Sequence, residues 1–122
     1  MESNKFIFDF EKLDVYNLGL EFLDKIFEVC DKFATKYQFS LGEQLRRAAL
    51  SITNNIAEGS GQRSKKEKIH FYSFAINSTR ECASMINITL KQYLIDKNEF
   101  YNLRSYCVRI TSMLFRLIES LR

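Results

Sequence analysis

A short basic segment, Arg63-Ser64-Lys65-Lys66-Glu67-Lys68, is the part of the sequence whose residue types best fit a chemical task. Its Ser-x-x-Glu spacing predicts a capping box, in which Ser64 accepts a hydrogen bond from an unpaired amide at the start of a helix. Free amides, the helix dipole and the side-chain charges all attract anions at such a place. The segment therefore predicts a contact for a nucleic-acid backbone. A solvated helix end is the alternative interpretation.

Two further arginines, Arg46 and Arg47, lie on the preceding predicted helix. One of them fits an ion pair with Glu43 or Glu58, and the other would then project into solvent. We include both among the predicted phosphate contacts. The complete predicted nucleic-acid-binding set is Arg46, Arg47, Arg63, Lys65, Lys66 and Lys68.

The sequence offers little for catalysis. Glu58 is a candidate acid or base, but no second acid or histidine stands at a defined spacing from it, and active sites need several convergent groups. We interpret Asn55 and Glu58 as residues that tie the end of one helix to the next, with Arg80 or Glu81 as partners. The chain is therefore predicted not to be an enzyme.

The only histidine provides the competing hypothesis. The spacing of Arg63 and His70 resembles the arginine–histidine element of helical HEPN ribonucleases, in which the histidine acts as acid or base at a scissile phosphate. That resemblance implies a metal-independent ribonuclease. Because arginine and histidine often fall at this spacing by chance in a basic helix, we keep it as the less favoured alternative.

Neither a cofactor nor a metal is predicted. The three cysteines, Cys30, Cys82 and Cys107, fall within apolar helical patterns and have no metal-ligand spacing, so they are interpreted as buried free thiols. The Gly59-Ser60-Gly61 sequence lacks the lysine of a phosphate loop. The N-terminus does not have the layout of a signal peptide, and no apolar run approaches a membrane span, so the expected location is cytoplasmic.

Apolar periodicity predicts four helices, over residues 11–36, 41–58, 65–94 and 99–121. Proline is absent, which leaves long helices uninterrupted. We predict that Ser40 caps the second helix with Phe39 as an apolar staple, that Gly59–Gly61 end it in left-handed backbone, and that an Asp96 cap begins the fourth. Short connections between such helices give an all-α, up-and-down antiparallel bundle.

The first predicted helix carries two apolar stripes. One, which we expect to face the core, runs through Leu13, Tyr16, Leu20, Leu23, Phe27, Cys30 and Ala34. The other runs through Val15, Leu18, Phe22, Ile26 and Val29. Because a small bundle does not cover every helix on two sides, we predict that this second stripe is an oligomer interface. A single wide core is the alternative.

Length and charge fit one small domain. The chain has 122 residues, of which 46% are hydrophobic, enough for a single core. Residues 1–42 carry five lysines against eight acids, whereas residues 43–122 carry thirteen basic residues against seven acids. Such an asymmetry is compatible with self-association and with anion binding.

The stretch LRRAALSITNNIAEGSGQRSKKE resembles the conserved pattern of the bacterial four-helix-bundle proteins encoded in 23S rRNA intervening sequences, a family related to the accessory variability protein of diversity-generating retroelements. Asn55, Glu58 and Gly59 belong to the matched pattern, and Glu81 continues the likeness in the third helix. Thr53 departs from it, where the family often has proline. The matching residues are Gln44, Arg46, Arg47, Ala48, Ala49, Ser51, Ile52, Asn55, Ile56, Ala57, Glu58, Gly59, Arg63, Ser64, Lys66 and Glu67.

This resemblance implies a four-helix bundle that assembles as a homopentamer, and a reverse transcriptase as a partner if one is encoded nearby. A ring would repeat each basic segment and strengthen a weak phosphate site through avidity. The predicted role is a non-enzymatic, RNA- or DNA-binding or scaffolding assembly. A protein-binding adaptor without a nucleic-acid role is the alternative.

Overall fold

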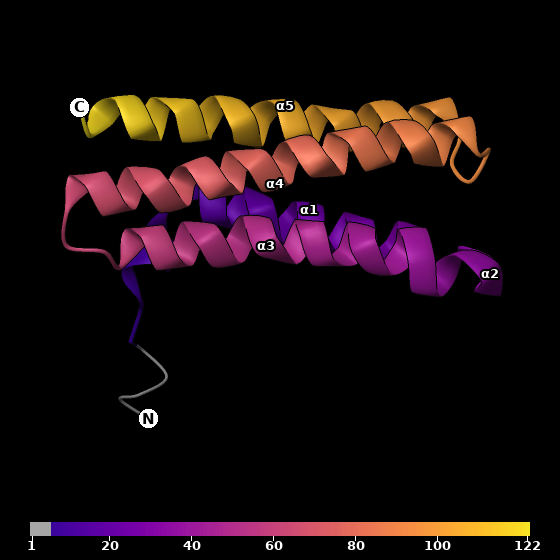
Figure 1. Ribbon diagram of the computed structural model, residues 1–122, viewed down its shortest axis with the longest axis horizontal. Coiled ribbons are helices and arrows are strands. Elements are labelled where there is room, and N and C mark those ends of the chain that lie inside the picture. Colours follow the sequence, from indigo (N-terminus) through magenta and orange to yellow (C-terminus); the bar gives the residue numbers. More distant parts are fainter. Residues whose placement is uncertain (1–5) are drawn as a thin grey trace.

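The computed structural model describes residues 6–122, which form an elongated antiparallel bundle of four long helices (Figure 1). The long helices are α1 (Asp14–Asp31), α3 (Glu43–Ser60), α4 (Lys65–Lys91) and α5 (Lys97–Ser120). Helices α1 and α4 each pack against both α3 and α5. The predicted all-α up-and-down bundle is confirmed.

Three short elements complete the described chain. A 3₁₀-helix, η2 (Asp9–Lys12), precedes α1, and a single turn, α2 (Thr35–Tyr37), leads into a π-helix, η3 (Gln38–Gly42). The π-helix continues directly into α3, because Gly42 before it already has helical backbone angles. The predicted Ser40 cap is therefore wrong. The predicted Phe39 staple is wrong as well, since that ring is almost fully exposed.

The core of the bundle includes the second stripe of α1 and much of the first, so the alternative of a single wide core is the one observed. The second stripe (Val15, Leu18, Phe22, Ile26 and Val29) is buried within the chain. Of the first stripe, Cys30 is buried and Leu13, Tyr16 and Leu23 pack against the core, whereas Leu20 is exposed. Gly19 lies between the two stripes and lets α1 approach α3 closely, because a Cβ there would lie 2.9 Å from Thr53 Cγ2. The prediction that the second stripe forms an oligomer interface is wrong, because those side chains are covered by their own bundle.

The turn between α3 and α4 depends on glycine for close packing. In the described chain no glycine has a positive φ, and Gly61 at the end of α3 has φ −83°, so the predicted left-handed ending is wrong. Instead, a Cβ on Gly59 would lie 2.7 Å from Tyr72 Cε1, so α4 packs against the bare backbone of α3. Ser64 then caps α4 as predicted, its Oγ accepting from the Glu67 amide at 3.0 Å. Among the described residues the return bond from the Glu67 side chain to the Ser64 amide is absent, so only half of the predicted capping box forms.

At the opposite end of the bundle, α4 is terminated by a residue with left-handed backbone angles. Tyr93 has φ 61°, and its amide donates to the Leu90 carbonyl at 3.0 Å while the Leu94 amide donates to the Thr89 carbonyl at 3.0 Å. This pair of bonds is a Schellman motif with tyrosine where glycine is usual. Asp96 caps α5 as predicted, its Oδ1 accepting from the Glu99 amide at 2.8 Å.

The described part of the N-terminal leader presents aromatic rings to solvent. Phe6 and Phe8 are exposed, whereas the Phe10 ring packs against Tyr16 of α1 with 4.9 Å between ring centroids. Phe10 therefore holds the leader to α1.

All three cysteines lie in the core as free thiols, as predicted. Burial raises the pKa of the Cys30 thiol from its ordinary value of 9.0 to about 11 and that of Cys107 to about 12. Burial also raises the pKa of Cys82. At neutral pH these thiols are protonated and behave as small apolar side chains.

Candidate nucleic-acid interface

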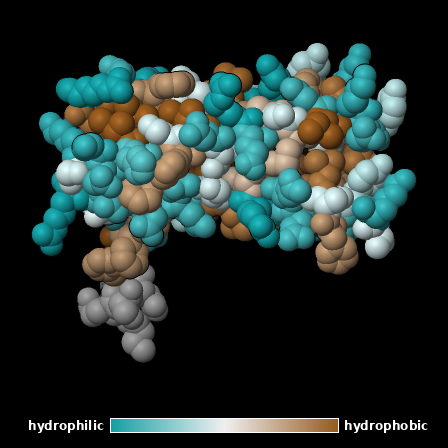
Figure 2. All heavy atoms as spheres, viewed as in Figure 1, coloured by the Kyte–Doolittle hydropathy of each residue, from teal (hydrophilic) through white to brown (hydrophobic). Residues whose placement is uncertain are grey.

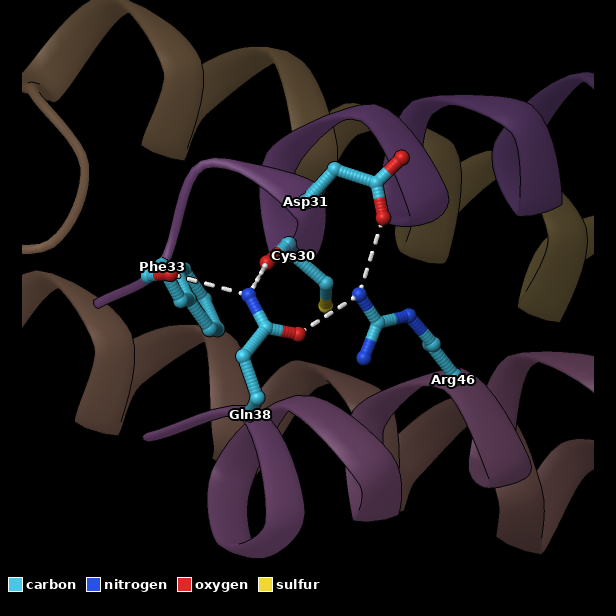
Figure 3. Close-up of polar contacts among 5 residues, drawn as sticks. All are labelled: Cys30, Asp31, Phe33, Gln38 and Arg46. Carbon is cyan, nitrogen blue, oxygen red and sulfur yellow. Dashed lines mark hydrogen bonds and ion pairs between the residues drawn. The ribbon is translucent and has the colours of Figure 1, made fainter. Parts of the chain in front are cut away.

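Arg46 is held in a structural clamp between α3 and the end of α1 (Figure 3). Its Nη2 lies 2.9 Å from Asp31 Oδ1 and 3.0 Å from Gln38 Oε1. The Gln38 amide group in turn donates to the carbonyls of Cys30 at 2.8 Å and Phe33 at 2.9 Å. Gln38 thus satisfies one carbonyl in the last turn of α1 and one just beyond it, where the predicted helix to residue 36 instead ends at Asp31.

Arg47 follows Arg46 but faces solvent. Its Nη2 lies 3.0 Å from Glu43 Oε1, one turn earlier on α3, in an exposed ion pair. Arg47 therefore forms the predicted ion pair with Glu43, whereas Arg46 is held by residues outside α3. About 20 Å of helix separates this pair from the α3–α4 turn. The structure therefore does not bring Arg46 and Arg47 together with the basic segment.

Lys68 also has a structural contact. Its Nζ donates to the Ser60 carbonyl at 2.7 Å, and Ser60 is the last residue of α3. A cation placed on the free carbonyls at a helix C-terminus satisfies them and complements the helix dipole. This contact joins the first turn of α4 to the end of α3. The ammonium group of Lys68 is therefore partly engaged within the protein.

The remaining cations of the segment are free of such contacts. Arg63, Lys65 and Lys66 are exposed, and within residues 6–122 no ion pair involves any of them. They surround the capped N-terminus of α4, at the end of the bundle where hydrophilic side chains project in Figure 2. Of the six predicted phosphate contacts, these three form a cluster with unengaged charge.

Asn55 does not contact α4 through the predicted partners; it bonds to Ser51 within α3, and Ser51 makes the contact to α4. Its Nδ2 donates to the Ser51 carbonyl at 2.8 Å and to Ser51 Oγ at 3.0 Å, and Ser51 Oγ lies 2.8 Å from Ser78 Oγ on α4. The expected partners, Arg80 and Glu81, are exposed, and in the described chain neither shares a hydrogen bond with Asn55. Glu58 is also exposed, and its carbonyl accepts from Gln62 Nε2 at 3.1 Å.

His70 sits among aromatic rings on the first turns of α4. Its ring centroid lies 4.4 Å from that of Phe74 and 5.9 Å from that of Phe71. Across residues 6–122 no hydrogen bond joins His70 to Arg63, the pair on which the ribonuclease alternative depends. Nor do the described residues contain a group of three or more side chains that could hold a metal ion.

Sequence reasoning did not single out a groove between α4 and α5. Val108 and Phe115 are about 60% and 55% exposed along it, one heptad apart on α5. Arginines from both helices surround these apolar side chains, and no acidic residue lines the groove. The repeat of exposed apolar residues at Tyr101, Val108 and Phe115 was the available signal. The lining residues are Thr79, Arg80, Ala83, Arg104, Cys107, Val108, Thr111, Ser112, Phe115 and Arg116.

Within the described chain, no helix is long and apolar enough to cross a membrane. Among solved structures, the chain is similar to a protein of unknown function from the S23 ribosomal protein family of Bacteroides thetaiotaomicron. The TM-score is 0.80 at 20% identity, and the match covers 86% of this chain and 95% of that one, which shows a shared fold. No curated protein matches the sequence.

The sequence also matches a protein-family model over residues 11–116, which is most of the chain and includes α1, α3, α4 and nearly all of α5. The family is described as the 23S rRNA-intervening sequence protein. The match contains the Arg46 clamp, the Gly59 packing site and the basic segment at the start of α4. The chain therefore belongs to the family of 23S rRNA-intervening sequence proteins.

Proposed function

We propose that this protein is a non-enzymatic nucleic-acid-binding protein, with RNA as its preferred class, and that Arg63, Lys65 and Lys66 contact the phosphates. The observation that carries the proposal is the cluster of three exposed cations around the start of α4, none of which is in an ion pair within residues 6–122. Protein cations that neutralise phosphates release counterions from the nucleic acid, and this release drives binding.

A homo-oligomer, with a pentamer as its expected form, is part of the same proposal. Repeating the cluster in every subunit would let one RNA strand engage several weak sites, which raises the overall affinity. Because the second stripe of α1 is internal, the apolar side chains available for subunit contact are those left exposed, such as Leu20, Leu50, Val108 and Phe115. Light scattering of the protein in solution measures the subunit number.

Charge reversal tests the phosphate contact. The double variant Lys65→Glu/Lys66→Glu should weaken binding of a labelled RNA strand strongly in an electrophoretic shift or anisotropy titration. Lys91→Glu/Lys97→Glu is the matched control, since it changes the net charge equally at the other end of the bundle, where both lysines are also exposed. Equal weakening by both pairs would show that only overall charge matters, and would reject the site.

A protein-binding adaptor is the second candidate, and the groove between α4 and α5 favours it. Exposed apolar side chains flanked by Arg80, Arg104 and Arg116 suit an amphipathic helix with acidic flanks. Val108→Glu would abolish such binding without changing RNA affinity at the far end of α4. An adaptor alone predicts that wild-type protein binds neither RNA nor DNA at low salt.

A further inference from the structure

We propose that His70 and Phe74 form a stacking platform that makes the basic site select single-stranded nucleic acid over duplex. This inference rests on the proposed function and adds the form of nucleic acid that the site accepts. Single-strand sites combine cations that follow the backbone with exposed aromatic faces that stack the bases. The start of α4 has both components within three helical turns.

The spacing along α4 places the two components on one side of the helix. Lys66, His70 and Phe74 follow one another at intervals of four residues, so their side chains stand in a row about 6 Å apart along the helix axis. Arg63 and Lys65 flank the same turn. A strand whose phosphates lie against the cations would therefore carry its bases toward the rings.

The rings are open to solvent although they contact each other. Phe74 is 43% exposed, and His70 is exposed as well. Their edge-to-face contact, with 4.4 Å between centroids, holds the two side chains in a fixed relation while part of each surface stays uncovered. Phe71, which is half-buried, makes a further edge-to-face contact with Phe74, with 6.2 Å between ring centroids.

Charge decides which partner fits this patch. An apolar partner could cover the rings but would leave Arg63, Lys65 and Lys66 without counter-charges, whereas a nucleic-acid strand supplies both phosphates and flat bases. Glu67 is the one exposed acid within this first turn, so phosphates should avoid it and lie nearer Arg63 and Lys66. Glu67→Gln should accordingly tighten binding.

Selection against duplex follows from access to the bases. In a duplex the base faces are stacked on one another, so the platform cannot reach them and only the phosphate contacts remain. In a single strand the faces are available, and each stacked base is worth about 5- to 150-fold in affinity. Phe74→Leu should therefore reduce the affinity for a short oligo-uridine strand by roughly this range, and leave the affinity for a duplex of equal length unchanged.

Tryptophan fluorescence provides a direct readout, because the chain contains no tryptophan. Phe74→Trp keeps a stacking face and places a single reporter in the platform, so it should retain strand affinity and be quenched when oligo-uridine binds. Phe115→Trp is the matched control, since Phe115 is similarly exposed (55%) but lies on α5 outside the basic site. Its fluorescence should not change.

The outcomes separate the two proposals. If Lys65→Glu/Lys66→Glu abolishes binding while Phe74→Leu does not, and the fluorescence of the Phe74→Trp variant is not quenched, the platform is refuted and the proposed function stands. If folded wild-type protein binds neither strand nor duplex at low salt, the proposed function fails and the platform fails with it. Equal affinity of the wild type for strand and duplex also overturns the platform.

Discussion

Arg46 and Asp31 are fifteen residues apart in the sequence and join α3 to the end of α1, with 2.9 Å between Nη2 and Oδ1. The same nitrogen also donates to Gln38, which holds the carbonyls at the end of α1. One arginine therefore fixes the end of α1, the π-helix η3 and the start of α3 together. This role explains Arg46 without any ligand.

Replacing this arginine should destabilise the fold. Arg46→Leu removes a hydrogen bond to Gln38 and an ion pair with Asp31, and we expect a loss of about 1–2 kcal/mol in the free energy of unfolding, measured by urea denaturation. The Arg46 side chain is only 24% exposed, but that of Asp31 is 72% exposed, so solvent screens the ion pair and the part-buried bond to Gln38 contributes most of the loss. Arg47→Leu is the control and should cost about 0.5 kcal/mol or less, because its ion pair is exposed. Equal losses of unfolding free energy in the two variants would show that the Arg46 contacts do not stabilise the fold.

Gly59 and Gly61 should respond in opposite directions to alanine. A Cβ on Gly59 would meet the Tyr72 ring at 2.7 Å, so Gly59→Ala should destabilise the protein by about 1–3 kcal/mol through overpacking. A Cβ on Gly61 meets nothing closer than 3.7 Å, and its backbone suits alanine. Gly61→Ala should therefore be neutral or stabilising by up to about 1 kcal/mol. Thermal unfolding of both variants checks this, and a neutral Gly59→Ala would contradict it.

These two glycines show where sequence reasoning succeeds and where it stops. Residues 59–61 marked the end of a helix correctly, because glycine is a common helix terminator. Whether a glycine provides left-handed backbone or a close approach depends on the neighbouring helix, and periodicity carries no information about Tyr72. The Ser64 and Asp96 caps were predictable because a capping hydrogen bond is local in sequence.

The two stripes of α1 and the Arg46 clamp also show which features could not be predicted from the sequence. Both stripes have helical spacing, so their pattern alone does not say which faces the core. Gly19 lets α3 approach α1 closely, but it lies between the two stripes and does not distinguish them. For the basic site, the segment could be located from charge. The contacts that engage Arg46 and Lys68, however, come from a residue distant in sequence and from a carbonyl across a turn.

Tyr93 offers a stabilising substitution. A left-handed backbone costs a non-glycine residue about 1–2 kcal/mol, and the side chain is 94% exposed, so it contributes little packing. Tyr93→Gly should therefore stabilise the protein by about 1 kcal/mol, measured by chemical denaturation. Gln92→Gly, at the adjoining position without positive φ, should be destabilising instead. A destabilised Tyr93→Gly would show that the ring has a role in the fold.

Cysteine burial predicts the behaviour at alkaline pH. The folded protein holds the Cys30 and Cys107 thiols protonated to about pH 11 and about pH 12, whereas an unfolded thiol ionises near its ordinary pKa of 9.0. The folded state therefore binds more protons above pH 9, so stability is complete below that pH and falls as pH rises toward 11. At neutral pH a thiol reagent should react only as the protein unfolds. Rapid labelling of all three cysteines in the native protein would contradict this.

The salt dependence of RNA binding tests the central claim, that Arg63, Lys65 and Lys66 contact phosphates, most directly. For a single strand, the slope of log K against log salt is about −0.7 for each phosphate neutralised. The triple variant Arg63→Ala/Lys65→Ala/Lys66→Ala should therefore have a slope shallower than wild type by about two, whereas Lys91→Ala/Lys97→Ala keeps the wild-type slope. An unchanged slope in the triple variant would show that these cations do not contact the nucleic acid, and would contradict the account.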